Sequence, residues 1–98
     1  MEFEMISGKE MERYLKEGNA FVIDLRLPAE YAARHIPGAV NIPYARLKNV
    51  KELPRDVPLI LNCERGSVSM VAARELAARG YRTKTLIGGI HAWHSRLG

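Results

Sequence analysis

Residues 58–69 read Pro-Leu-Ile-Leu-Asn-Cys-Glu-Arg-Gly-Ser-Val-Ser, and a long segment rich in Ala, Arg and Leu follows them. The apolar start of this stretch is typical of a buried strand, and the rest of a short polar loop that opens a helix. Such a loop, with Gly66 at its centre, directs several backbone N–H groups and the positive end of the helix dipole into one small space. Cys63 stands at the start of the loop, where these donors would stabilise a thiolate. We therefore interpret Cys63 as a reactive thiol.

The alternative is that Cys63 is simply a small apolar core residue, since cysteine is among the most buried residue types. The residues that follow it are not of the kind that fills a core: Glu64, Arg65, Gly66, Ser67 and Ser69. The loop composition therefore favours the reactive interpretation.

Length and composition indicate one globular domain over residues 1–98, with 47% hydrophobic and 27% charged residues. The apolar runs are too short to span a bilayer, and the acidic start of the chain does not resemble a signal peptide. We therefore expect no membrane association. A single cysteine cannot form an intramolecular disulfide, so the expected location is a reducing cytoplasm.

The formal net charge is +4, but the basic residues are dispersed and not interleaved with aromatic ones. Nucleic-acid binding is therefore not expected. Two interpretations of the charge stay open. It serves solubility, or it steers small anions or an acidic partner protein toward the Cys63 loop.

Hydrophobic periodicity and helix end signals predict the elements of the fold. We expect one long helix at 8–17, with Ser7 as N-cap and Gly18 as terminator, and another at 69–79, closed by Gly80. Shorter helices are expected at 28–33, 45–51 and 90–97, the last following Gly88 and Gly89. Strands are expected at 21–25 and 58–62, and more weakly at 40–42 and 83–87.

Strands that alternate with helices predict an α/β fold with a mostly parallel sheet and helices on both of its faces. Ligands of such sheets bind at the carboxyl ends of the strands. Cys63 directly follows the predicted strand 58–62, so the candidate nucleophile falls at the expected edge of the sheet.

Four sequence motifs in order resemble those of single-domain rhodaneses, the sulfurtransferase family. They are Asp24-Leu-Arg26 with Ala29-Glu30-Tyr31, the stretch His35-Ile-Pro-Gly-Ala-Val-Asn-Ile-Pro43, the Cys63 loop, and Gly88-Gly-Ile-His-Ala-Trp93. The resemblance covers nearly the whole chain. It implies a three-layer rhodanese-like fold with a mostly parallel five-stranded sheet.

The same resemblance implies a function for the loop. Cys63 occupies the position of the family's persulfide-forming cysteine, and residues Glu64, Arg65, Gly66, Ser67 and Val68 occupy the loop that binds the substrate and the persulfide. The implied activity is that of a thiosulfate sulfurtransferase, which takes sulfur from a small anionic donor and passes it to a thiol, to cyanide or to an acceptor protein. The resemblance implies no cofactor and no metal.

Several polar residues near the loop are expected to have structural roles. Asp24 and Arg26 would form an ion pair that ties loops together, and His35 would be a hydrogen-bonded turn residue. Ser69 would support the loop as the first residue of the helix behind it. His91 and His94 have the spacing of helical metal ligands, but no third ligand accompanies them. We expect Trp93 in the core, and Glu30 as a local cap or as one partner of a local ion pair.

The loop departs from a common family pattern, Cys-x-x-Gly-x-Arg-Ser, because Val68 stands at the position of the arginine. We expect this change to weaken turnover of anionic donors. Arg65 could supply a positive charge, although Glu64 partly offsets it. The arrangement of backbone N–H donors in the loop depends on Gly66 more than on any side chain.

Three other functions are alternatives to thiosulfate sulfur transfer. A rhodanese-like module that binds a partner or regulates without turnover is favoured slightly by Val68, but the retained Cys63 counts against it. A phosphatase normally has Arg where this chain has Ser69, and the loop lacks the small-residue pattern associated with 3-mercaptopyruvate. The physiological donor and acceptor and the oligomeric state do not follow from the sequence.

Overall fold

The computed structural model describes residues 3–97, and for residues 95–97 the backbone alone. The elements, in chain order, are β1 (Glu4–Ile6), α1 (Gly8–Glu17), β2 (Phe21–Asp24), α2 (Pro28–Ala33), β3 (Val40–Asn41), α3 (Tyr44–Leu47), β4 (Leu59–Asn62), α4 (Ser67–Ala78), β5 (Thr83–Leu86) and α5 (Gly89–Leu97). Five strands form one sheet in the order β1-β5-β4-β2-β3, and every neighbouring pair is parallel.

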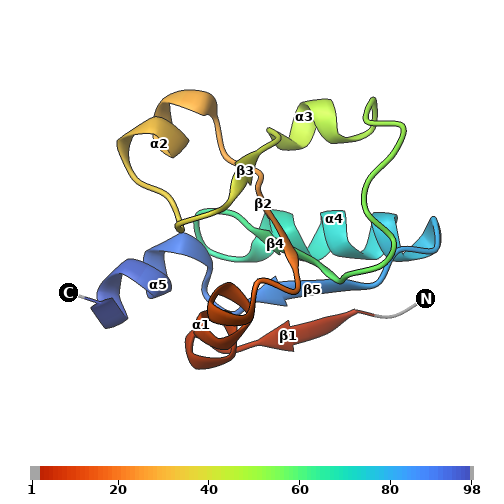
Figure 1. Cartoon of the computed structure of the whole chain (residues 1–98). Helices are drawn as coiled ribbons and strands as arrows, with labels where there is room; N and C mark the ends of the chain where they lie inside the picture. The colour runs from red at the N-terminus through yellow and green to blue at the C-terminus, as the bar shows by residue number, and fades with distance from the viewer. Residues whose placement is uncertain (1–2, 98) are drawn as a thin grey trace.

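The sheet lies between two layers of helices, as the alternation of strands and helices predicts (Figure 1). One cluster of buried side chains joins β2 and β4 to α3 and α4. A second cluster, on the opposite face, joins the sheet to α1, α5 and the segment around α2. The three-layer α/β architecture expected from the sequence is confirmed.

The strand β4 lies at the centre of the sheet, between β2 and β5. All four of its residues are buried, which explains why Leu59, Ile60 and Leu61 form a continuous apolar run rather than an alternating one. Leu59 and Leu61 face α4, whereas Ile60 faces α1 and α5. Cys63 continues this alternation and points to the α4 side of the sheet.

Local chemistry sets the ends of α1. The Ser7 side chain accepts a hydrogen bond from the Glu10 backbone N–H, and the Glu10 side chain accepts one from the Ser7 backbone, which together form a capping box. Gly18 ends the helix with φ of +68°. Both ends agree with the sequence expectation.

Several predicted boundaries are wrong by one to four residues. The helix α4 spans Ser67–Ala78 rather than 69–79, and α3 is a single turn that starts at Tyr44 and ends before the predicted helix 45–51 does. The helix α5 begins at Gly89, one residue early. The strands β2, β3 and β5 each end one residue before the predicted end, and β4 begins one residue after the predicted start. The strand β1, at the sheet edge beside β5, had no predicted location. No helix in the described part of the chain is long and apolar enough to cross a membrane.

Candidate functional site

Cys63 lies at the carboxyl end of the central strand β4, where the chain turns toward α4. Only 5% of the residue is exposed, and its side chain belongs to the buried cluster on the α4 face. Burial alone would fit the core interpretation. The polar contacts of the sulfur distinguish this cysteine from an ordinary core residue.

Two backbone N–H groups point at the sulfur of Cys63. The Sγ atom accepts hydrogen bonds from the N–H of Gly66, at 3.1 Å, and of Ser69, at 3.3 Å. Ser69 is the third residue of α4, so its N–H is one of the first-turn donors that have no acceptor within the helix. Fixed donors and the positive end of the helix dipole stabilise negative charge on a sulfur atom placed there.

The early start of α4 changes the role assigned to Ser69. The sequence placed Ser69 beside the site as the first residue of the helix, but its own N–H reaches the sulfur. Its hydroxyl also donates to the carbonyl oxygen of Gly66 at 3.0 Å, which fixes the shape of the loop. Gly66 has φ of +106°, a conformation that L residues other than glycine rarely adopt. The loop geometry therefore requires the glycine that the sequence singled out.

The loop is held from a second direction by the start of α5. The N–H of Ile90 donates to the carbonyl oxygen of Cys63 at 2.8 Å, and that of His91 donates to the carbonyl oxygen of Glu64 at 3.0 Å. Gly89 has φ of +65°, and a Cβ atom there would overlap the Cys63 carbonyl oxygen and lie 2.7 Å from that of Glu64. The sequence analysis missed this contact, although the double glycine before a helix was its signal.

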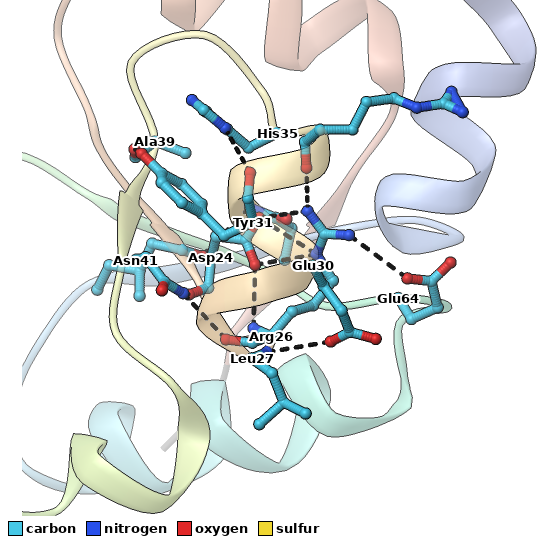
Figure 2. Close-up of polar contacts among 12 residues, drawn as sticks. Asp24, Arg26, Leu27, Glu30, Tyr31, His35, Ala39, Asn41 and Glu64 are labelled. Atoms are coloured by element: carbon cyan, nitrogen blue, oxygen red, sulfur yellow. Dashed lines mark hydrogen bonds and ion pairs between the residues drawn. The ribbon is translucent and has the colours of Figure 1, made fainter.

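Arg26 connects three segments around the loop (Figure 2). Its guanidinium donates to the fully buried carboxylate of Asp24 at 3.0 Å and to the carbonyl oxygen of Arg34. It also pairs with Glu64 at 3.5 Å. Burial by itself would lower the pKa of Arg26, but the hydrogen bond to Asp24 and the charges of Asp24 and Glu64 raise it overall. The predicted pair is confirmed, and Glu64 extends it to the Cys63 loop.

His35 and Glu30 have the structural roles expected of them. The Nδ1 atom of His35 lies 2.7 Å from the carbonyl oxygen of Tyr31, and the two rings stack with their centroids 3.8 Å apart. The Glu30 carboxylate accepts a hydrogen bond from the backbone N–H of Leu27 at 3.0 Å, at the start of α2. Trp93 is buried in the core, as expected.

The remaining loop side chains are exposed. Arg65, Ser67 and Val68 point to solvent, and 40% of Val68 is exposed. Within residues 3–97, Arg65 forms no ion pair, so its charge is available to a ligand. Glu64 is half exposed but is engaged by Arg26.

A small hollow lies on the α5 side of Glu64. Its volume is about 230 Å³, and it is lined by Arg34, Glu64, His91 and His94. Burial, reinforced by the positive charges of Arg34 and Arg26, lowers the pKa of His94, while Glu64 opposes this effect. Within the described residues, no three His, Cys, Asp or Glu side chains are arranged to hold a metal ion.

Residues 7–96 match the family model of the rhodanese-like domain. The chain belongs to the rhodanese-like family. A solved rhodanese-related protein from Thermoplasma volcanium has 27% sequence identity and a TM-score of 0.89, with 96% of this chain and 93% of that one covered. A rhodanese homologue from Thermus thermophilus has 36% identity and a TM-score of 0.72, with 89% and 96% covered.

Two curated relatives carry sulfurtransferase names. A tRNA sulfurtransferase of Desulfurococcus amylolyticus is 35% identical over 80 residues, which are 82% of this chain and 16% of the relative. An adenylyltransferase and sulfurtransferase, MOCS3, of Drosophila sechellia is 32% identical over an alignment of 104 positions, which covers 96% of this chain and 23% of the relative. This rhodanese-like chain thus spans less than a quarter of the length of either relative.

Proposed function

We propose that this rhodanese-like domain is a sulfurtransferase that carries a sulfane sulfur on Cys63. The observation that carries the proposal is the pair of N–H groups, from Gly66 and Ser69, directed at the Cys63 sulfur. A buried cysteine with no chemical role would not need two backbone donors, one of them from the first turn of a helix.

In the first half-reaction, the Cys63 thiolate attacks the outer sulfur of a donor such as thiosulfate. The S–S bond of thiosulfate breaks, its electron pair leaves with sulfite, and Cys63 becomes a persulfide. The outer sulfur of this persulfide carries negative charge. The N–H groups of residues 64–68, together with that of Ser69, are the donors proposed to hold it.

In the second half-reaction, an acceptor nucleophile attacks the outer sulfur and the Cys63 thiolate leaves. The acceptor would be a thiol or an acceptor protein, and cyanide can replace either in a test reaction. Since the two half-reactions share one covalent intermediate, the proposal predicts ping-pong kinetics. A small anionic donor would meet the exposed guanidinium of Arg65, but no positive charge at Val68.

The experiment is a measurement of intact mass. The reduced protein is incubated with thiosulfate, and we expect a gain of the mass of one sulfur atom, which cyanide then removes. Cys63→Ser should show neither change, and circular dichroism should show that this variant is folded. A folded wild-type protein that gains no sulfur would contradict the proposal.

A second candidate function is a rhodanese-like module that binds a partner without turnover. Two observations favour it: Val68 stands where family members often have arginine, and Cys63 is only 5% exposed. The mass measurement separates the two functions, because a binding module forms no persulfide.

A further inference from the structure

Exposed apolar side chains gather around the edge of the sheet where Cys63 lies. The large apolar residues that are exposed in the described chain are Met5, Leu27, Val40, Tyr44, Val68, Val71 and Ile87. Leu27, Tyr44, Val68 and Val71 follow the carboxyl ends of β2, β3 and β4, and we call these four residues the rim patch. Met5 and Val40 lie on the two edge strands instead.

Backbone hydrogen bonds bring the segments that carry the rim patch together. The N–H of Leu25 donates to the carbonyl oxygen of Asn62 at 2.9 Å, next to Cys63. The carbonyl oxygen of Leu25 accepts from the N–H of Tyr44 at 3.0 Å. Leu27 is two residues further along, and its side chain extends from the backbone to the side away from the Arg26 guanidinium (Figure 2). The rim patch therefore borders the Cys63 loop.

The patch continues along one side of α4. Val68, Val71 and Glu75 are spaced by three and four residues, so their side chains lie on the same side of the helix. The hydroxyl of Tyr44 donates to the Glu75 carboxylate at 3.1 Å, which shows that this side faces α3. Beyond it lies a hollow of about 420 Å³, lined by residues that include Tyr44, Lys48, Glu75 and Arg79.

The charge that this face offers a partner is positive. Its acidic side chains are engaged within the domain, Glu64 by Arg26, Glu75 by the hydroxyl of Tyr44, and Glu30 by the backbone N–H of Leu27. Three exposed basic residues, namely Arg65 on the loop and Lys48 and Arg79 beside the hollow, form no ion pair within residues 3–97. The face thus combines an apolar centre with a basic periphery, which complements an apolar segment flanked by acidic residues.

We propose that the rim patch docks an acidic acceptor protein, which presents its cysteine on an apolar segment flanked by acidic residues. This inference rests on the proposed function. The thiolate of the partner attacks the outer sulfur of the Cys63 persulfide, the S–S bond breaks, and its electron pair returns to Cys63 as a thiolate. The partner cysteine becomes the persulfide. The sulfane sulfur moves without an external oxidant or reductant.

The apolar side chains of the rim patch contribute nothing to binding a hydrated small anion. Val68 also lacks the positive charge of the arginine that many family members have at this position. Apolar side chains exclude water from a protein interface and bury apolar area there. The same substitution that weakens the site for small donors therefore suits it to a protein surface.

The test uses the intact domain loaded with sulfur from thiosulfate and freed from excess donor. Three cysteine peptides then serve as acceptors. One has leucine on both sides of its cysteine and glutamates beyond, the second has lysines in place of the glutamates, and the third has serines in place of the leucines. Each transfer rate is divided by the rate at which the same peptide reacts with an aromatic disulfide, which removes differences in thiol reactivity.

We expect the peptide with leucine and glutamate to accept sulfur about tenfold faster than the other two, and 0.5 M salt to reduce its advantage over the lysine peptide. Val71→Glu, and independently Leu27→Glu, should remove most of this preference and leave loading from thiosulfate within about twofold of wild type. The matched control is Met5→Glu, because Met5 is 47% exposed, Val71 is 44% exposed, and Met5 lies on the far edge strand. It should change neither rate.

Equal normalised rates for the three peptides, with normal loading, would overturn the docking proposal and leave the proposed function intact. A preference that survives both Val71→Glu and Leu27→Glu would also overturn it, because the rim patch would not be the docking surface. A folded protein that takes up no sulfur from thiosulfate would overturn the proposed function and this inference with it.

Discussion

The N–H of Ile90 donates to the carbonyl oxygen of Cys63 at 2.8 Å, so the residue whose sulfur is held by α4 has its backbone held by α5. Two helix N-termini therefore converge on one residue from opposite layers of the fold. A cysteine fixed at both its sulfur and its carbonyl group has little freedom to move, which would favour a single reactive geometry in the proposed sulfur transfer.

Gly89→Ala should disturb the loop more than an ordinary glycine substitution does. The added Cβ would overlap the Cys63 carbonyl oxygen, and the residue would also keep an unfavourable φ of +65°. We expect a loss of stability of about 2–3 kcal/mol, since backbone strain and a steric clash combine. Sulfur loading from thiosulfate should fall at least about tenfold in the folded protein, because 1.4 kcal/mol at the transition state is tenfold in rate.

The matched control is Gly18→Ala at the end of α1. Gly18 has nearly the same φ, +68°, but no atom lies within 4 Å of its added Cβ. Urea unfolding should show a loss of about 1 kcal/mol, with normal loading. If both variants load sulfur at the wild-type rate, the contact between α5 and the loop does not position Cys63.

Arg26→Gln should destabilise the fold strongly. The Arg26 side chain is 7% exposed and that of Asp24 is fully buried, so the substitution leaves a buried carboxylate without its counter-ion. Removing one partner of such a pair costs about 3–5 kcal/mol in urea unfolding. Arg55→Gln is the control, because its pair with Glu52 is exposed and 4.0 Å long, and should cost less than about 1 kcal/mol. A loss below about 1 kcal/mol for Arg26→Gln would show that water already compensates Asp24.

Val68→Arg should increase kcat/KM for thiosulfate. A guanidinium at the mouth of the loop can hold the sulfonate oxygens of the donor, which contributes on the order of 1–2 kcal/mol, a roughly 5–30-fold change. Val71→Arg adds the same charge one helical turn away and should give a gain of less than about twofold. Steady-state rates at fixed ionic strength provide the comparison. Equal kcat/KM for wild type and Val68→Arg would mean that the missing charge does not limit the enzyme.

Acidification should reduce stability through His94. Burial and the charges of Arg34 and Arg26 lower the pKa of His94 in the folded state, so the unfolded chain takes up this proton first as the pH falls. The stabilising contribution is complete above the ordinary histidine pKa of about 6.5 and is lost as the pH falls through that value toward the folded pKa. In an NMR titration, Arg34→Gln should raise the pKa of His94, whereas Arg46→Gln on α3 should not. An unchanged His94 titration in Arg34→Gln would exclude this electrostatic coupling.

The sequence predicted the architecture because the signals that define it are local. The apolar run of β4, the Ser7 cap of α1 and the glycines after α1 and α4 each determine an element without distant contacts. The position of Cys63 at the carboxyl edge then follows from the parallel arrangement of strands. Periodicity located only four strands. The family motifs implied the fifth.

What the sequence did not predict depends on contacts between distant segments. The strand β1 has three residues, of which Ile6 alone is buried, so its apolar pattern is too short to recognise. The pair between Arg26 and Glu64 and the bond from Ile90 to Cys63 join residues far apart in the chain. Ser67 was assigned to the loop because serine is common both in loops and at helix starts.

The pairing of β1 with β5 also has a consequence for the order in which the domain assembles. Glu4 lies opposite Lys84, 80 residues further along the chain, whereas β4, α4 and β5 are consecutive. The entropy lost on closing a loop grows with its length, so the edge strand β1 is the most costly to dock, whereas β4 and β5 pair residues only 24 apart, such as Leu59 and Thr83. In native-state hydrogen exchange we expect the amides of β1 to open well before those of β4. Cys63 would then keep the hydrogen bonds from Gly66 and Ser69 to its sulfur during the commonest partial unfolding of the domain.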